Sequence, residues 1–462
     1  MARSRVTAGA AVVVGIGFAA IEAIVLNARI RDYDEGVYWQ SVRALARGEP
    51  LFSSVFASQP PAFYYALLPF GVVGHSLASL RLGVLILGLI GLAATYLVGR
   101  VLAGPMAGIA AVLLAATSPL YLHQSGIVQA DGPATALSVM AVAFALLAVR
   151  AKSSWRDALA VATGLTLALA TGFKLLGAIT LVPIAIVLFG ASRGRGRLLL
   201  AAAAGALAGS VIVLIPAMMA PRAAVDQLVL MHLRAGDGRE SLGSNINLLL
   251  LHREVPLELL ALLGTVVALL RRNPAILMPL AWLVTSVLAV LFYHPLFAHH
   301  LVMLSLALAL VAAVGLSPQF RFWGLAGVAL VLATAVAGAV VAERDVQLAL
   351  VPDRHNAEVV AAVRGTGRTS DFWISDNPYA IAATRRDVPG PLVDTSGQRT
   401  RAGLLTLADL EAARVRYHVQ WVLEDSFRLD AVPGYRGWLS QHFHAVEQLG
   451  GRAVIYEQDT AP

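Results

Sequence analysis

Long apolar stretches separated by short polar segments dominate the first three quarters of the chain. A membrane-spanning helix needs about 20 apolar residues, and the pattern predicts about eleven such spans. Their expected limits are 7–28, 78–99, 103–122, 131–149, 157–173, 175–191, 198–219, 256–270, 274–293, 298–316 and 322–342. The shorter apolar segment 60–74 predicts an interfacial or re-entrant helix, because it is below spanning length and Pro61 suits a first helical turn.

Basic residues gather near alternate ends of these spans, as they do on the cytoplasmic side of membrane proteins. The segments that agree lie at 3–5, 100, 150–156, 193–197, 271–272 and 321. The pattern predicts an N-terminus inside and a C-terminus outside, although a few arginines also fall outside. The polar segments 29–60, 121–131 and 220–255, and the tail from about 343, are then expected to face outward.

The tail has a different pattern, in which strand-like runs alternate with amphipathic helices. Strands are expected at "DFWISD", "GPLVDTS", "VQWVLED" and "RAVIYEQD", and helices at "PYAIAATRR", "LTLADLEAARVR" and "YRGWLSQHF". This alternation favours a small α/β domain with a parallel or mixed sheet. The chain is therefore expected to comprise a transmembrane domain at 1–342 and an extracytoplasmic α/β domain at 343–462.

Composition supports the membrane assignment. Of the 462 residues, 58% are hydrophobic and 14% are charged, whereas soluble proteins carry roughly 25% charged residues. The absence of cysteine excludes disulfides, thiolate catalysis and cysteine-held metal clusters. A pI of 9.9 would indicate nucleic acid in a soluble protein. Here it reflects cytoplasmic loops, and no nucleic-acid partner is expected.

Three acids stand directly after the first span: Asp32, Asp34 and Glu35. Apolar residues recur at helical spacing from Val37 to Arg47, so Asp34 and Glu35 are expected at the N-terminus of an amphipathic helix on the outer surface. One interpretation is that Asp34 is an N-cap and Glu35 favours the helix dipole. A single cap accounts for one acid only, so a functional site is the alternative.

Asp131 is a second acidic centre, and it precedes the fourth predicted span. Pro133 lies in the first turn of that span, so Asp131 is either a helix cap or a site residue. The predicted topology brings Asp131 out on the same face as Asp34 and Glu35. Two acidic centres on one outer face favour a site.

Basic candidates lie on the same predicted face. Lys174 interrupts the apolar segments 157–173 and 175–191, where an ammonium is functional, ion-paired or extended to the interface. Arg222 belongs to the loop 220–255, whose polar and glycine-rich middle suits either a mobile segment over a site or a plain surface loop.

The outer segment "YHPLFAHH" contributes His294, His299 and His300. Their i, i+5, i+6 spacing does not place all three on one helix face, which disfavours a zinc site. Hydrogen bonding to an anionic substrate, or a structural role for at least one histidine, is favoured instead.

The order of these segments resembles that of GT-C glycosyltransferases. The resemblance is carried by "RDYDEGVYWQSVRALARGEPLF", "SQPPAFYYALLPFGVVGHSLASLRLGVLILG", "VQADGPATALSVMAVAFAL", "GFKLLGAITLVP" and "HHLVMLSLALALVAAVG", over about 1–316. The chain is most similar to the glycosyltransferase 39, or dolichyl-phosphate-mannose–protein mannosyltransferase-like, group, which includes the lipid A aminoarabinose transferases. Gln59 departs from this pattern, because relatives often carry Lys before Pro-Pro.

The resemblance implies a membrane enzyme that takes a sugar from a polyprenyl phosphate donor. Asp34 matches the position of the catalytic acid, and is expected to act as the base of an inverting reaction. Asp131 matches the acid before the fourth span, and Glu35 and Asp131 would orient the base or the acceptor, or bind a divalent cation if one is used. No obligatory metal is expected. Lys174, Arg222, His299 and His300 are the candidate phosphate-binding residues.

The expected location is the plasma membrane of a bacterium, because the arginine bias and the abundance of Ala, Gly, Leu and Val fit a GC-rich genome. The active site would face the extracytoplasmic side, and the acceptor would be a lipid, glycan or protein hydroxyl. Two other classes of protein remain open at this point. One is a polytopic transporter, and the other is a non-catalytic scaffold with an outer binding domain.

Overall fold

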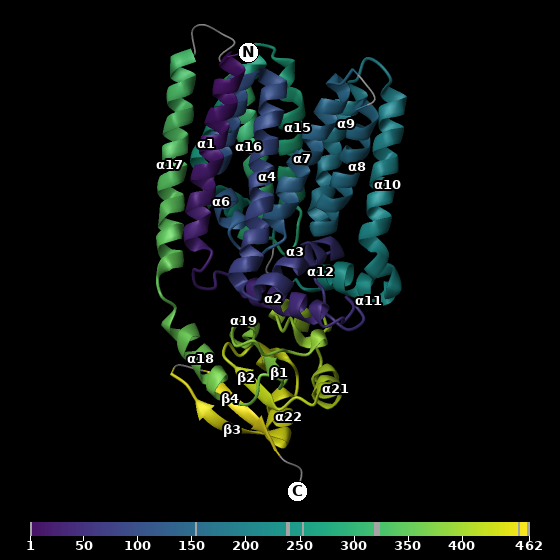
Figure 1. Cartoon of the computed structure of the whole chain (residues 1–462), viewed down its shortest axis with the longest axis vertical. Helices are drawn as coiled ribbons and strands as arrows, with labels where there is room; N and C mark the ends of the chain where they lie inside the picture. Colours follow the sequence, from purple (N-terminus) through teal and green to yellow (C-terminus); the bar gives the residue numbers. More distant parts are fainter. Residues whose placement is uncertain are drawn as a thin grey trace. The chain divides into compact units, whose positions relative to one another are not determined.

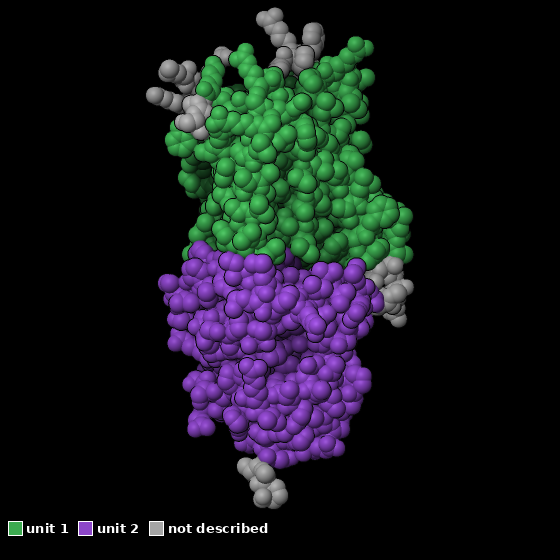
Figure 2. Space-filling model, turned by 90° about the vertical axis from the view of Figure 1, so that its right-hand side faces the viewer, with its two compact units in different colours: residues 1–26, 81–214, 241–348 green, residues 27–80, 215–240, 349–462 purple. Residues whose placement is uncertain are grey.

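The computed structural model of the chain describes residues 2–152, 155–236, 241–251, 254–317, 324–450 and 453–459. Arg321, one of the residues used to predict orientation, lies outside the described residues. The chain forms two compact units, which Figure 2 colours separately. Unit 1 comprises residues 1–26, 81–214 and 241–348, and unit 2 comprises residues 27–80, 215–240 and 349–462. Each unit is therefore built from three separate segments of the chain.

Unit 1 is helical. Its main helices are α1 (Ala2–Val25), α4 (Leu77–Ala103), α5 (Pro105–Ala116), α6 (Pro119–Ser125), α7 (Asp131–Arg150), α8 (Trp155–Phe173), α9 (Leu181–Phe189), α10 (Arg195–Met219), α13 (Leu242–Leu251), α14 (Val255–Leu270), α15 (Leu277–Leu291), α16 (Val302–Gly315) and α17 (Gly324–Leu350). The short 3₁₀ helices η1 (Leu175–Thr180), η3 (Pro274–Ile276) and η4 (Ala298–Leu301) connect some of them.

Helix α16 lies at the centre of this unit. It is apolar all round and nearly all of its residues are buried, as expected of a helix surrounded by others. It packs against α5, α14 and α15. Figure 1 labels α15 next to it. A Cβ on Gly315 would stand 2.2 Å from the carbonyl oxygen of Gly264 on α14, so only glycine permits this approach. Small residues at such crossings are typical of membrane helices.

Among the described residues, seven helices are long and apolar enough to cross a membrane. The count is eight if α5 and α6, which meet at a bend of 69°, form one span. The chain is therefore a polytopic membrane protein. Two predicted spans, 175–191 and 256–270, appear as the shorter apolar helices Leu175–Phe189 and Val255–Leu270. The total of about eleven spans and the orientation stay predictions.

Unit 2 combines short helices with one sheet. Its helices are α2 (Tyr33–Ala46), α3 (Pro61–Gly74), α11 (Pro221–Val225), the π-helix η2 (Asp226–Leu230), α12 (Met231–Arg234), α18 (Arg354–Gly365), α19 (Pro378–Ala383), η5 (Gly390–Leu392), α20 (Gly397–Arg401), α21 (Leu407–Tyr417), η6 (Arg428–Ala431) and α22 (Tyr435–His442). The short helix expected at 60–74 is thus present as α3.

The sheet has strands β1 (Trp373–Ser375), β2 (Trp421–Glu424), β3 (Phe443–Gln448) and β4 (Val454–Gln458), in the order β1-β2-β4-β3. β1 and β2 are parallel, with Ile374 opposite Val422. The other two pairings are antiparallel. The sheet is therefore mixed, and its apolar residues pack with Leu410 and Leu439 from α21 and α22.

Three of the four predicted strand segments contain strands β1, β2 and β4. The expectation for "GPLVDTS" was wrong, because Gly390–Leu392 is a 3₁₀ helix and a loop follows. Two prolines, Pro389 and Pro391, lack the N–H groups that a strand would donate. Strand β3 was missed because its residues after Phe443 are exposed and do not form a recognisable apolar pattern.

Candidate active site

The three acids near the start of α2 take different positions. Asp32 is the N-cap residue, and its carboxylate accepts a 2.9 Å hydrogen bond from the backbone N–H of Asp34. The interpretation of Asp34 as the N-cap is therefore wrong by two residues, since Asp34 is the second residue of the helix. Its side chain is partly exposed. Because Asp32 caps the helix, the carboxylate of Asp34 is not needed for that purpose.

Glu35 is completely buried. Its carboxylate accepts a 2.9 Å hydrogen bond from the backbone N–H of Arg31, four residues earlier. This bond joins the segment before α2 to the first turn of the helix. Burial of an acid requires such partners, because an unpaired buried carboxylate is costly. Glu35 is thus buried, and Asp34 is the more accessible acid of the two.

Asp131 and Lys174 form an ion pair in unit 1. Asp131 is the first residue of α7, where the N-cap residue is Ala130 and no side chain caps the helix, so the interpretation of Asp131 as a cap is wrong. Lys174 lies between α8 and η1, with an extended backbone that breaks the helix there. Its ammonium is 3.3 Å from a carboxylate oxygen of Asp131, and both side chains are 7% exposed.

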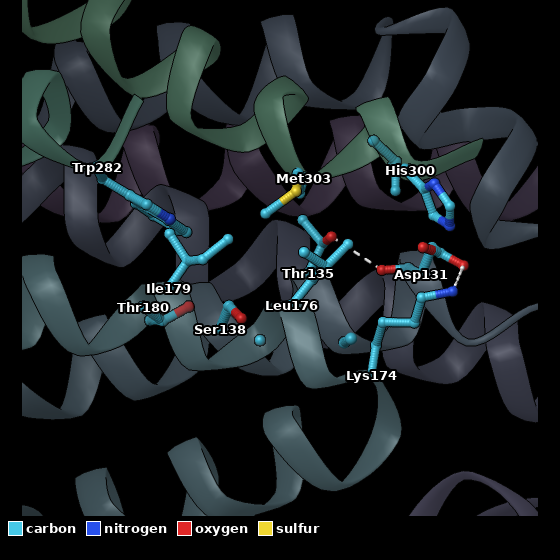
Figure 3. Close-up of a pocket in the computed structure, with 13 residues that line it drawn as sticks. Asp131, Thr135, Ser138, Lys174, Leu176, Ile179, Thr180, Trp282, His300 and Met303 are labelled. Carbon is cyan, nitrogen blue, oxygen red and sulfur yellow. Dashed lines mark hydrogen bonds and ion pairs between the residues drawn. The ribbon is translucent and has the colours of Figure 1, made fainter. Parts of the chain in front are cut away.

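A pocket extends from this ion pair between α7, η1, α15 and the start of α16 (Figure 3). Asp131, Lys174 and His300 form its charged and polar end (Figure 3). The rest of the lining includes Thr135, Ser138, Leu176, Ile179, Thr180, Trp282 and Met303. The pocket thus joins a polar end to a largely apolar body with a few hydroxyl groups.

The histidines His299 and His300 lie in η4, beside this ion pair. Figure 3 shows His300 and Lys174 on opposite sides of the Asp131 carboxylate. The backbone N–H of Phe297 donates a 3.1 Å hydrogen bond to Nδ1 of His300. Because Nδ1 is an acceptor, the neutral ring carries its proton on Nε2 and can donate from that atom.

Asp131, His299 and His300 also have the composition of a metal site, since their ligand atoms lie within 4.8 Å of one another. The sequence argument against a metal considered the three histidines on one helix, and it did not foresee Asp131 as the partner. However, the Lys174 ammonium already neutralises Asp131, and its charge opposes a cation. The cluster is better suited to an anion, which the ammonium and the imidazole N–H groups can bind.

Some candidates lie elsewhere or were missed. Arg222 belongs to unit 2, where it is an exposed residue of α11. Thr135 and Ser138 were missed, although they follow Asp131 at i+4 and i+7 and thus share its face of α7. That spacing of hydroxyls within an apolar span was the available signal. Trp282 and Thr180 had no comparable signal, because their place in the pocket depends on how distant helices pack.

Comparison with known proteins shows what the chain is similar to. Residues 58–220 match the family model described as dolichyl-phosphate-mannose–protein mannosyltransferase. The structure is similar to apo ArnT from Cupriavidus metallidurans, with a TM-score of 0.70, 15% identity and coverage of 96% of this chain and 97% of ArnT. For ArnT bound to undecaprenyl phosphate the TM-score is 0.66, with 14% identity and coverage of 98% and 97%.

A third similar structure is the archaeal oligosaccharyltransferase AglB from Archaeoglobus fulgidus, in complex with an inhibitory peptide and a dolichol-phosphate. Its TM-score is 0.58, with 14% identity and coverage of 97% of this chain and 74% of AglB. No curated protein sequence matches the chain significantly. The chain therefore has the GT-C fold, and the resemblance to protein mannosyltransferase-like proteins inferred from its sequence is confirmed.

Proposed function

We propose that the chain is a membrane glycosyltransferase that moves a sugar from a polyprenyl-phosphate-linked donor to an acceptor hydroxyl outside the cytoplasm. The observation that carries this proposal is the pocket of unit 1 in the context of a GT-C fold. The pocket offers a buried ammonium at one end and an apolar body at the other. A phosphate attached to a lipid and a sugar has matching chemistry.

Lys174 is assigned the role of binding the donor phosphate. Phosphate oxygens compete with Asp131 for the ammonium, and Nε2–H of His300 is a second donor for them. His299 lies next to His300, with the two ring centroids 4.4 Å apart, and contributes a further polar group. Arg222 is assigned a supporting contact with the donor phosphate. With these groups offsetting the phosphate charge, an obligatory divalent cation is not required.

Asp34 is assigned the role of general base. Its carboxylate takes the proton of the acceptor hydroxyl as the hydroxyl oxygen forms a bond to the anomeric carbon. The bond from that carbon to the phosphate oxygen breaks, and polyprenyl phosphate leaves with the electron pair. Because attack occurs opposite the leaving phosphate, configuration at the anomeric carbon inverts. Glu35 supports the helix start that carries Asp34, and Asp131 orients Lys174.

The acceptor class and the bacterial plasma membrane as location belong to the same proposal. The acceptor is a hydroxyl group of a lipid, glycan or protein on the extracytoplasmic face. The abundant arginine, alanine and glycine agree with a bacterial source. The undecaprenyl phosphate bound to ArnT and the dolichol-phosphate bound to AglB indicate polyprenyl phosphates as the carrier class to try first.

A transfer assay tests the proposal. The purified protein is incubated with a panel of radiolabelled polyprenyl phosphate sugars and membrane extract, beside the Asp34→Asn variant. We expect label to move from one donor class to an extract component. Asp34→Asn should reduce the rate about 10²–10⁴-fold, the usual effect of removing a general base. If the folded protein transfers sugar from none of the donors, the proposal that it is a glycosyltransferase is refuted. If Asp34→Asn works at the wild-type rate, the assignment of Asp34 as the base is refuted.

A further inference from the structure

The C-terminal segment of unit 2 holds the helix that carries Asp34. Gln40, which is completely buried in the middle of α2, donates to the backbone oxygen of Arg386 at 3.1 Å and accepts from the backbone N–H of Val388 at 3.4 Å. One turn later, Arg43 donates to the carboxylate of Asp387 at 2.8 Å. These bonds join residues more than 340 positions apart in the sequence. They fix the body of α2 against the loop after α19.

The residue next to Asp34 has its own set of contacts. The hydroxyl of Tyr33 accepts a 2.9 Å hydrogen bond from the backbone N–H of Thr395. The hydroxyl of Thr395 donates to the backbone oxygen of Ser375, at the end of β1, so Tyr33 is the donor in the 3.1 Å contact between the two hydroxyls. A directed chain of hydrogen bonds therefore runs from Tyr33 to the sheet.

The ring of Tyr33 is held from another side. The guanidinium of Arg428 lies over it, 4.1 Å from the ring centroid, at a distance typical of a cation–π contact. Arg428 in turn donates to the hydroxyl of Ser426 at 2.6 Å and to the backbone oxygen of Asp376 at 3.3 Å. Burial raises the pKa of the Tyr33 hydroxyl above its ordinary value, so the hydroxyl stays protonated and remains a donor.

The first turn of a helix has few backbone bonds of its own and frays easily. Tyr33 is the first residue of α2, and Asp34 follows it directly. Anchoring Tyr33 to the sheet therefore restricts the backbone that carries the Asp34 carboxylate. A displacement of about 1 Å in a catalytic group can cost about 10²-fold in rate.

We infer that Tyr33, Thr395 and Arg428 are positioning residues, through which the α/β part of the chain holds the Asp34 carboxylate in its reactive orientation. This inference rests on the proposed role of Asp34 as the base. In this inference, residues 349–462 support catalysis by positioning Asp34 and do not themselves contact the substrate. None of the three side chains takes or gives a proton in the transfer reaction.

Substitutions that delete single contacts test the inference in the full-length protein. Tyr33→Phe keeps the ring and removes the hydroxyl, Thr395→Val removes the partner hydroxyl, and Thr395→Ser restores it. We expect Tyr33→Phe and Thr395→Val to lower kcat about 10- to 100-fold, with the donor KM unchanged within about two-fold. Thr395→Ser should recover most of the rate. Thermal unfolding shows whether each variant is folded.

The control is Arg436→Lys. Arg436 lies over the ring of Tyr435 and pairs with Glu424 and Asp430, so it resembles Arg428 in chemistry. Among the described residues, no hydrogen bond or ion pair joins it to α2. Arg428→Gln should lower kcat, whereas Arg436→Lys should leave kcat unchanged. An equal loss in both variants would mean that any disturbance of this part of the chain reduces activity, and would overturn the inference.

A double variant separates this inference from the proposed function. If Tyr33 acts through Asp34, then Tyr33→Phe should cause no further loss in the Asp34→Asn background. An additive loss in the double variant would contradict the inference. So would a wild-type kcat in both Tyr33→Phe and Thr395→Val, if Asp34→Asn has lost its activity. An active Asp34→Asn variant would instead refute the proposed base. If Thr395→Val fails to fold, the comparison of Tyr33→Phe with wild type still decides.

Discussion

At the scale of single residues, the start of α2 shows how position gives one functional group three uses. Asp32 caps the helix, Glu35 is buried and accepts from a backbone N–H, and Asp34 retains an exposed part. The cluster of acids could be found in the sequence, because it interrupts an apolar pattern. The sequence could not show which of the acids is the cap. Helix boundaries predicted from sequence are uncertain by one or two residues, and the candidate acids lie within that range of one another.

Lys174 shows a similar limit, and it leads to a prediction. The sequence indicated a functional, paired or interfacial ammonium, and the structure shows a buried pair with Asp131. Lys174→Gln leaves that carboxylate unpaired, which costs about 3–5 kcal/mol for a buried pair. The double variant Lys174→Gln/Asp131→Asn removes both charges, so its thermal unfolding midpoint should return toward wild type.

The shift of the unfolding midpoint on adding polyprenyl phosphate then separates donor binding from folding. Added polyprenyl phosphate should raise the unfolding midpoint of the wild type, because a ligand that binds the native state stabilises it. The double variant should show little of this ligand-induced shift. Lys152→Gln changes the other lysine, which is exposed, and should behave as wild type. The assignment of Lys174 to the phosphate is wrong if the double variant and the wild type respond equally.

At the scale of elements, the docking of α2 depends on a position without a side chain. A Cβ on Gly36 would stand 2.5 Å from the backbone nitrogen of Tyr379 on α19, closer than any real contact. The obstacle is backbone, which cannot rotate away. We therefore expect Gly36→Ala to lower the stability of the folded protein by about 1–3 kcal/mol, the usual cost of overpacking.

Gly437 is the matched control for Gly36. It also lies in a helix, α22, but a Cβ there meets nothing within 4 Å. Gly437→Ala should be neutral or stabilising by about 0.4–1 kcal/mol, because alanine restricts the unfolded chain. Chemical or thermal unfolding of both variants measures the difference. Equal stability of Gly36→Ala and Gly437→Ala would show that α2 and α19 are not packed as the structure has them.

Elements were predicted well where a local pattern determines them. Apolar length gave the long helices, and buried strand centres gave β1, β2 and β4. Prediction failed at "GPLVDTS", where prolines outweigh the apolar residues, and at β3, whose residues after Phe443 are exposed. The pocket in unit 1 was predicted only at its charged end, because Trp282 and Met303 reach it through the packing of helices that are distant in sequence.

At the scale of the whole molecule, the sequence predicted domains at 1–342 and 343–462, whereas the structure groups 349–462 with 27–80 and 215–240. A boundary near 343 follows from the change in composition, which is a local signal. The partners of Gln40 are not local, since they lie 338 to 348 residues away. No periodicity along the chain encodes a contact of that kind.

This grouping constrains the topology. Residues 27–80 and 349–462 form one unit, so both must lie on the same side of the membrane. The number of spans between them is then even. The prediction of eleven spans meets this condition, because ten follow the first. The seven long apolar helices meet it in total, but they place three spans between 27–80 and 215–240 and three between 215–240 and 349–462. Because 215–240 belongs to the same unit, a further segment must cross on each side of it.

Labelling of single cysteines tests the topology directly, because the chain has no cysteine of its own. Ser53→Cys and Ser440→Cys place a thiol at exposed positions of unit 2, in segments at opposite ends of the sequence. With the N-terminus inside, a membrane-impermeant thiol reagent should label both in intact cells. Ser192→Cys, in a segment rich in arginine, should react only after the membrane is permeabilised. Labelling of Ser192→Cys alone would reverse the predicted orientation. Labelling of only one of the two unit 2 positions would contradict the even number of spans, and with it the placement of Asp34 and the α/β segment on one side of the membrane.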